Sequence, residues 1–102
     1  MIVEFGKHGK SLGTRLDGKR IRTDTLQAIN EGSFVVFDFN GVDVISSSFA
    51  DECIGKLIPE LGIEKLKSKT NFQNVNPTVR LVIQKVLYNY SNFAVAKLLI
   101  YS

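Results

Sequence analysis

Three consecutive serines, at positions 46–48, are the residues of this chain best placed to take part in chemistry. Apolar runs at 34–39 and 42–45 precede them, and apolar residues then recur every four positions from Phe49 to Leu61. Hydroxyl groups are therefore expected where a core strand passes into a helix, a place where α/β proteins often bind ligands and partners. A serine at a helix start also favours phosphorylation, so the pattern indicates a switchable binding surface more than a catalytic centre.

The same serines also have a purely structural interpretation. We expect Ser47 or Ser48 to cap the following helix, and Ser48 together with Asp51 has the spacing of a capping box. Without other information, capping is the role we favour, and it is compatible with a binding role because a capping hydroxyl lies at an exposed helix end. Asp51 and Glu52 would point about 100° apart on a helix, so they do not form a catalytic carboxylate pair. They would repel a phosphate on the serines modestly.

The segment Gly9-Lys10-Ser11 lies between a predicted strand and a predicted helix, as does the phosphate loop of nucleotide triphosphatases. The spacing excludes that interpretation, because the loop needs a glycine five residues before Gly9 and Glu4 occupies this place. A carboxylate there would repel a phosphate.

Metal and triad chemistry also lack the residues they need. His8 is the only histidine and Cys53 the only cysteine, so we expect no metal site. A Ser-His-acid triad would have to use His8 from a connecting loop, and no Gly-x-Ser-x-Gly turn is present. Asp38 and Asp43 are expected to be solvated or to cap strand ends. The sequence therefore predicts no catalytic residue and no cofactor.

The chain of 102 residues is long enough for one hydrophobic core and too short for two, which predicts a single domain over residues 1–102. The hydrophobic share of 44% is typical of a soluble globular protein. No apolar stretch approaches the roughly 20 residues of a membrane-spanning helix, and residues 1–6 do not resemble a signal peptide. Cys53 lies in an apolar helical stripe and is expected to be a core residue. These features favour the cytoplasm.

A net charge of +3 makes nucleic-acid binding conceivable. However, aromatic residues do not alternate with the basic ones, as a stacking platform would require. We therefore expect a solvated basic surface without a nucleic-acid partner.

The hydrophobic pattern predicts strands at 2–5, 34–39 and 71–75 and helices at 14–31, from Ser47 or Ser48 to Gly62, and from Asn76-Pro77 onward. The strand at 34–39 is apolar on both faces, which is typical of a central strand covered by helices. Residues 65–69 are predicted to be a connection or a strand entry, and residues 93–102 fit a strand or a helix.

Several residues mark the ends of these helices. Thr14 and Asp17 have the spacing of a capping box, and Gly32 is placed to end the first helix. Pro59 is expected to distort or shorten the second helix, and Asn76 is expected to cap the third. The order β-α-β-α-β-α with short connections predicts an α/β sandwich with a mainly parallel sheet.

Two blocks of the sequence resemble a bacterial STAS-like family whose function is not established. The first is Gly41–Glu52, followed by Gly55-Lys56-Leu57 and Glu60-Leu61-Gly62, and the second is Asn74–Arg80. The likeness covers roughly residues 13–87 and implies a STAS-like α/β sandwich.

More distantly, the chain is similar to the STAS domains of anti-sigma-factor antagonists. In these, an Asp-Ser-Ser-Gly segment opens a helix and carries the serine that a partner kinase phosphorylates. Alignment on the preceding strand places Ser46 at the aspartate, Ser47 and Ser48 at the two serines and Phe49 at the glycine. The resemblance thus implies Ser48 as the phosphorylated residue, with Ser47 as the other candidate.

The resemblance implies a non-catalytic regulatory module that works in a partner-switching pathway and is controlled by serine phosphorylation. Its expected partner is a kinase-type ATPase with the histidine-kinase fold. The expected contact residues are Ser46, Ser47, Ser48, Phe49, Asp51 and Asn76. An alternative is a nucleotide or small-ligand binding module that uses the strand-to-helix crevice near Ser46–Ser48. A third is a nucleic-acid accessory module, for which binding would depend on salt.

Overall fold

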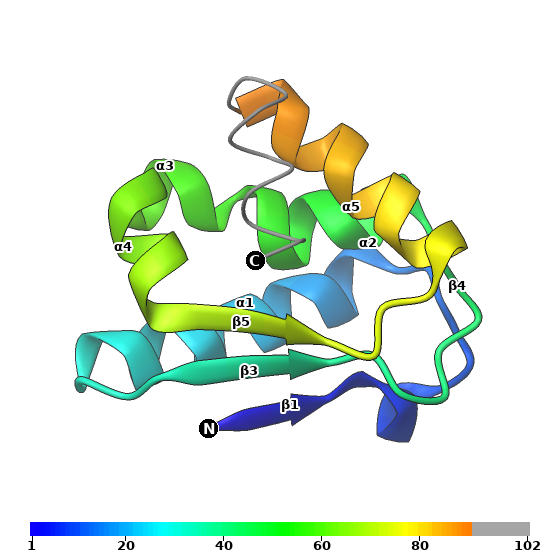
Figure 1. Ribbon diagram of the computed structural model, residues 1–102, viewed down its shortest axis with the longest axis horizontal. Helices are drawn as coiled ribbons and strands as arrows, with labels where there is room; N and C mark the ends of the chain where they lie inside the picture. The colour runs from blue at the N-terminus through cyan, green and yellow to red at the C-terminus, as the bar shows by residue number, and fades with distance from the viewer. Residues whose placement is uncertain (91–102) are drawn as a thin grey trace.

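A computed structural model describes residues 1–90 of the chain (Figure 1). Three short parallel strands lie side by side in the order β1 (Ile2–Glu4), β3 (Val35–Asp38) and β5 (Thr70–Gln73). A second parallel pair, which the sequence did not reveal, consists of β2 (Ser11–Leu12) and β4 (Val44–Ile45). The fold is therefore α/β with a parallel sheet, as predicted.

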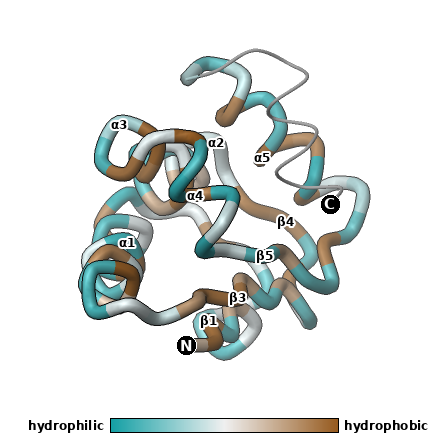
Figure 2. The backbone as a smooth tube through the Cα atoms, turned by 60° about the vertical axis from the view of Figure 1, so that its left-hand side comes forward, coloured by the Kyte–Doolittle hydropathy of each residue, from teal (hydrophilic) through white to brown (hydrophobic). Residues whose placement is uncertain are grey.

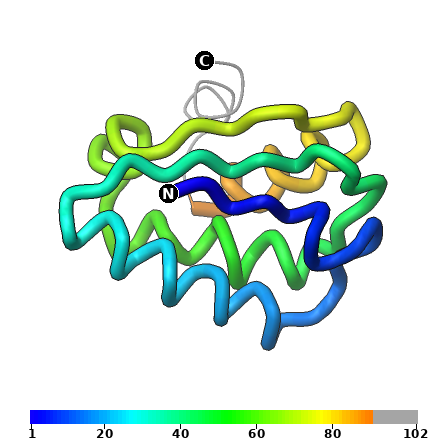
Figure 3. Tube along the Cα trace, turned by 90° about the horizontal axis from the view of Figure 1, so that it is seen from below, coloured from blue at the N-terminus to red at the C-terminus, as the bar shows by residue number. Residues whose placement is uncertain are grey.

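The helical elements occupy most of the remaining described chain. In order they are the 3₁₀ turn η1 (Phe5–His8), α1 (Arg15–Asn30), α2 (Ser47–Ala50), the π turn η2 (Asp51–Gly55), α3 (Leu57–Leu61), α4 (Ile63–Lys69) and α5 (Pro77–Tyr90). Figure 3 shows α1 and the helical stretch from α2 to α3 on the same side of the three strands. Among residues 1–90, no helix combines the length and apolar character needed to cross a membrane.

The core lies between the strands and these helices and is rich in phenylalanine. The strand register aligns Val3, Phe37 and Phe72 across the sheet. The ring of Phe5 stacks on that of Phe39, with centroids 4.3 Å apart. Figure 2 shows hydrophobic colouring along β3 and β4 and mixed colouring along α1, as expected for a helix with one face on the core.

The central position of β3 is confirmed, but its two faces differ. Val35 and Phe37 are buried, whereas Val36 and Asp38 are only partly buried and the preceding Phe34 is 49% exposed. Burial thus alternates with the period of a strand, although the sequence is apolar at nearly every position. The expectation that both faces are buried is wrong for the described residues.

The first predicted helix is confirmed as α1. The Thr14 side chain accepts a hydrogen bond from the backbone nitrogen of Asp17 at 3.2 Å, as the capping spacing predicts. The helix is followed by Glu31 and then by Gly32, whose φ of 91° is in the left-handed region that favours glycine.

The second predicted helix is a run of three segments, α2, η2 and α3. In η2 the backbone nitrogen of Lys56 donates to the carbonyl of Asp51, five residues earlier, at 2.9 Å, which widens the turn. Pro59 explains the position of this turn, because its ring would clash with the carbonyl of Gly55 in a regular helix. Gly62, with a φ of 82°, ends the run as predicted.

The segment 65–69 is part of α4, so its prediction as a connection or strand entry is wrong. Leu66 is fully buried and Ile63 packs against the core, which gives this short basic helix an apolar anchor. The predicted third strand exists as β5, slightly earlier in the chain than expected. The ambiguous residues 93–102 lie outside the described residues.

Candidate functional site

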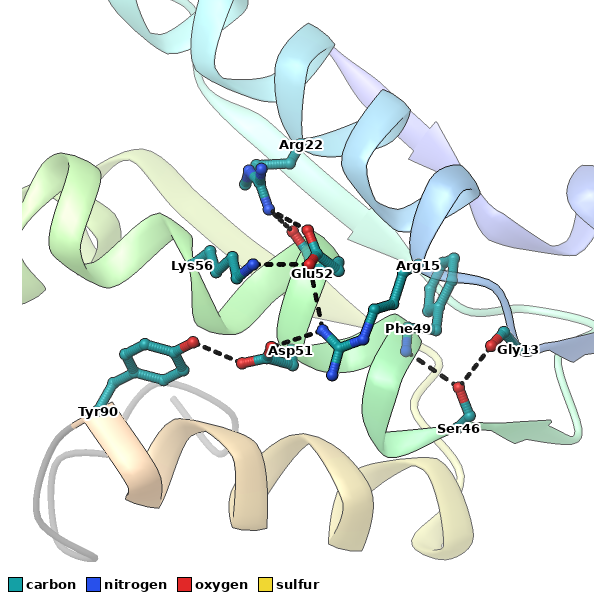
Figure 4. Close-up of polar contacts among 9 residues, drawn as sticks. All are labelled: Gly13, Arg15, Arg22, Ser46, Phe49, Asp51, Glu52, Lys56 and Tyr90. Atoms are coloured by element: carbon teal, nitrogen blue, oxygen red, sulfur yellow. Dashed lines mark hydrogen bonds and ion pairs between the residues drawn. The ribbon is translucent and has the colours of Figure 1, made fainter.

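The candidate site is the start of α2 together with the charged residues of η2 (Figure 4). We call this the α2–η2 surface and define it by Ser46, Ser47, Ser48, Asp51 and Glu52. The short strand β4 delivers the chain to this surface, and α1 and α5 pack on either side of it.

Ser46 caps the helix, whereas the sequence analysis assigned this role to Ser47 or Ser48. Its Oγ accepts a hydrogen bond from the Phe49 nitrogen at 3.0 Å. The same hydroxyl donates to the carbonyl of Gly13 at 3.0 Å, which ties α2 to the segment before α1. Ser46 has the extended backbone typical of an N-cap, with φ −80° and ψ 157°. Its hydroxyl is therefore committed to the fold.

Ser47 and Ser48 are the first two residues of α2. Ser47 is exposed and Ser48 is partly exposed. Ser47 also borders a groove of about 550 Å³ whose described lining includes Leu81, Gln84 and Lys85 of α5. Within residues 1–90, neither hydroxyl is hydrogen-bonded to a histidine or carboxylate that would activate it as a nucleophile.

Phe49 is completely buried, so it cannot contribute to a partner surface in this conformation. Its ring meets that of Phe5 edge-on, with centroids 6.1 Å apart and an interplanar angle of 81°. Its backbone lies against Gly18 of α1, where an added Cβ would be 2.9 Å from the Phe49 carbonyl oxygen. The bulky side chain at this position therefore extends into the core, and the expectation of a surface contact is corrected.

Glu52 is the centre of an ion-pair network, with a residue exposure of 8%. Its Oε1 is 2.6 Å from the Lys56 ammonium and 3.1 Å from Arg15, and its Oε2 is 2.9 Å from Arg22. The hydrogen bonds from Lys56 and Arg22 lower the pKa of Glu52 to about 2, against the opposing effect of burial. Glu52 is therefore ionised at neutral pH.

Asp51 connects α1 to α5. Its Oδ2 accepts from Arg15 at 3.0 Å, and its Oδ1 accepts from the Tyr90 hydroxyl at 2.5 Å (Figure 4). Partial burial would raise the pKa of Asp51, but the hydrogen bonds from Tyr90 and Arg15 together outweigh it and lower the pKa. The hydrogen bond to Asp51 raises the pKa of Tyr90 to about 12.

Asn76 holds the start of α5 in place. Its Oδ1 accepts from the Val79 nitrogen at 2.8 Å, which confirms the predicted N-cap. Its amide nitrogen donates to the carbonyls of Val42 at 2.9 Å and Asp43 at 3.1 Å. Both ends of this side chain are engaged within the fold, which assigns it a structural role in this conformation.

Asp38 lies at the end of β3 and has the capping role that the sequence suggested. Its carboxylate accepts hydrogen bonds from the side-chain amide of Asn74 at 2.8 Å and from the backbone nitrogen of Asn40 at 3.0 Å, and both lower the pKa of Asp38. In the described part of the chain, no group of three or more histidine, cysteine, aspartate or glutamate side chains could hold a metal ion. Cys53 is fully buried as predicted, and burial raises the pKa of its thiol.

The sequence analysis did not identify the residues that pair with Asp51 and Glu52. These partners are Arg15, Arg22, Lys56 and Tyr90. Only Lys56 carried a local signal, because it follows Glu52 by four residues and shares its helix face. Arg15, Arg22 and Tyr90 come from α1 and α5, 30 or more positions away in the chain. Their proximity depends on how the helices pack.

Comparison with known proteins identifies the family. The profile of a family described as a STAS-like domain of unknown function matches residues 17–80, more than half of the chain. The chain belongs to this STAS-like family. Searches of curated proteins and of solved structures found no match. The matched region contains the α2–η2 surface and ends within α5, so the STAS-like resemblance recognised in the sequence is confirmed.

Proposed function

We propose that this STAS-like domain is a regulatory module that binds a protein partner through the α2–η2 surface and is controlled by phosphorylation of Ser48 or Ser47. The observation that carries the proposal is that the three serines differ in their hydrogen bonding. Ser46 caps the helix, while the hydroxyls of Ser47 and Ser48 make no hydrogen bond within residues 1–90 and reach the surface. A phosphoryl group there would leave the cap intact.

The charges on this surface also support the proposal. The sequence analysis expected Asp51 and Glu52 to repel a phosphate, but Arg15, Arg22 and Lys56 are paired with them. The electrostatic cost of adding a phosphate one turn away is correspondingly lower. A phosphoryl group would then place about two negative charges in a partner interface, enough to release a partner.

The proposed partner is a kinase-type ATPase with the histidine-kinase fold, as the family resemblance implies. The serine Oγ would attack the γ-phosphorus of ATP, ADP would leave, and a base of the kinase would accept the hydroxyl proton. All of the phosphoryl-transfer machinery belongs to the partner in this scheme, and the STAS-like domain supplies the hydroxyl.

The alternative of a nucleotide or small-ligand site has less support. At the carboxyl edge of the main sheet, where such ligands bind in α/β proteins, β1 ends with Glu4 and β3 ends with Asp38. These two residues are paired in the strand register, so two carboxylates flank the position that a phosphate would need. Near the serines, the Ser46 hydroxyl is already engaged.

The test is phosphorylation by candidate kinase-type ATPases with ATP, followed by mass spectrometry of the peptides. Phosphate is expected on Ser48 or Ser47, and it should be lost when the labelled serine is replaced, in Ser48→Ala or Ser47→Ala respectively. It should be kept in the control Ser11→Ala, which changes another exposed serine. In binding assays, Ser48→Asp should weaken binding by about tenfold or more, equivalent to about 1.4 kcal/mol. Label elsewhere, or binding unchanged by Ser48→Asp, would contradict the switch.

A further inference from the structure

Arg15 has an unusual position beside the serines. It is the first residue of α1, and its Nη1 reaches across to Asp51 at 3.0 Å and Glu52 at 3.1 Å (Figure 4). Its side chain is 55% exposed. Within residues 1–90, its Nε and Nη2 donate no hydrogen bond. One side of the guanidinium is thus committed to carboxylates, and its other donors are available.

Ser48 shares a helix face with the two carboxylates that Arg15 binds. It precedes Asp51 by three residues and Glu52 by four, the spacing at which side chains on a helix are neighbours. The turn is continuous, because the Asp51 nitrogen donates to the carbonyls of Ser47 and Ser48. Ser47 precedes Asp51 by four residues but Glu52 by five, and it borders the groove along α5 with Lys85.

The ion-pair network of Asp51 and Glu52 has a net positive charge, which favours the binding of an anion. Arg15, Arg22 and Lys56 bring three positive charges, and Asp51 and Glu52 bring two negative ones. Arg22 is the least exposed of the cations, at 14% of its side chain, whereas Arg15 is exposed at 55%. The excess positive charge is therefore accessible at Arg15, on the face that carries Ser48.

We propose that Arg15 binds a phosphoryl group on Ser48 with the donors that its two carboxylate partners leave available. A planar guanidinium pairs with phosphate in a two-pronged geometry, and a dianion attracts it more strongly than one carboxylate does. Glu52 keeps Lys56 and Arg22, so the fold is maintained. Asp51 then shares Arg15 with the phosphate and keeps its hydrogen bond from Tyr90, so the charge of the surface between α1 and α5 changes. This inference rests on the proposed phosphorylation of the same surface.

The experiment installs phosphoserine directly at position 48, by genetic incorporation or by ligation of a synthetic peptide, so that no kinase is needed. Phosphorus NMR then follows the second ionisation of the phosphate, which has a pKa of about 6 when unperturbed. A neighbouring guanidinium stabilises the dianion and lowers this pKa. We expect it to lie about half a pH unit or more below the value in the Arg15→Gln variant.

Two controls make the measurement specific. Arg20→Gln removes another exposed arginine of α1 and is expected to leave the titration of phosphoserine 48 unchanged. Phosphoserine at position 47, which lies toward α5, is expected to be insensitive to Arg15→Gln. Equal titrations with and without Arg15, or an equal response at both serines, would overturn the assignment. If Arg15→Gln does not fold, Arg15→Met, which also removes the charge, takes its place: a pKa equal to that of the unsubstituted protein would overturn the assignment.

The outcome is independent of the kinase test. A depressed phosphate pKa without any phosphorylating partner would leave the Arg15 site standing and overturn the proposed pathway. Phosphorylation of Ser48 with a titration unaffected by Arg15→Gln would support the pathway and overturn the role of Arg15.

Discussion

At the residue scale, three adjacent serines have different surroundings because they stand at different positions relative to a helix start. Ser46 has extended backbone and turns its hydroxyl back to the Phe49 nitrogen. Ser47 and Ser48 already have helical backbone, so their side chains point away from the unpaired nitrogens. Only Ser46 is therefore expected to matter for stability.

Replacing Ser46 with alanine tests this difference. Ser46→Ala should lower the free energy of unfolding by about 1 to 2 kcal/mol, because the cap of α2 is lost together with the hydrogen bond to Gly13. Ser47→Ala and Ser48→Ala should each change it by less than about 0.5 kcal/mol. Urea unfolding followed by circular dichroism measures all three. An equal loss for Ser46→Ala and Ser48→Ala would contradict the capping assignment.

Glu52 gives a second prediction at this scale. In Glu52→Gln the little-exposed Arg22 loses its carboxylate partner, so we expect a loss on the order of 3 kcal/mol in the free energy of unfolding. Glu60→Gln on α3 is the matched control, since Glu60 is exposed, and should change stability by less than about 0.5 kcal/mol. Similar unfolding midpoints for the two variants in urea would show that the network contributes little.

At the scale of elements, the packing of α1 on the α2–η2 run depends on a close approach of two backbones. Gly18 lies in the first turn of α1, where helix propensity alone counts against it. The Cβ that alanine would add there would be 2.9 Å from the Phe49 carbonyl oxygen and 3.2 Å from the Cys53 nitrogen. The glycine allows α1 to reach the position from which Arg15 and Arg22 contact Glu52.

Gly18→Ala is therefore expected to lower the free energy of unfolding, although helix propensity alone predicts that it would raise it. Propensity predicts a gain of about 1 kcal/mol for this substitution in α1, whereas crowding against α2 and η2 predicts a net loss of about 1 to 3 kcal/mol. Gly13→Ala is the control, because nothing lies within 4 Å of its Cβ position. Thermal unfolding of both variants decides the sign, and a stabilised Gly18→Ala would contradict the close approach.

Element boundaries were predictable wherever a local signal exists and were missed where none does. Thr14 and Asn76 cap their helices as their residue types suggest. The helix at 63–69 was missed because its apolar anchors, Ile63 and Leu66, are too few to show a periodic pattern. The pair β2–β4 spans two residues per strand and exists through pairing between distant segments.

At the scale of the whole molecule, the Glu52 and Asp51 network joins α1, η2 and α5. These elements also form much of the core, so the charges of the surface and the packing beneath it are coupled. A proton added to the network is therefore expected to affect global stability.

The pH dependence follows from the direction of the shift. The pKa of Glu52 is lowered from 4.5 to about 2, so its contribution to stability is complete above about pH 4.5 and is lost as the pH falls toward 2. The urea midpoint should therefore fall steeply over this range. Glu52→Gln, which has no such group, should show a flatter profile over the same range. Parallel profiles for the two proteins would exclude Glu52 as the source.

By itself, the sequence determined the fold class, the STAS-like family, the buried Cys53 and the location of the serine block, because these depend on local patterns and residue types. The tertiary structure decided which serine caps α2, that Phe49 lies in the core, and that Arg15, Arg22 and Tyr90 converge on Asp51 and Glu52. The reason is physical: a side chain's partners across helices depend on interhelical distance. Here the distance between α1 and the α2–η2 run is set by the close backbone approach at Gly18, and α5 comes close to η2 at Gly55.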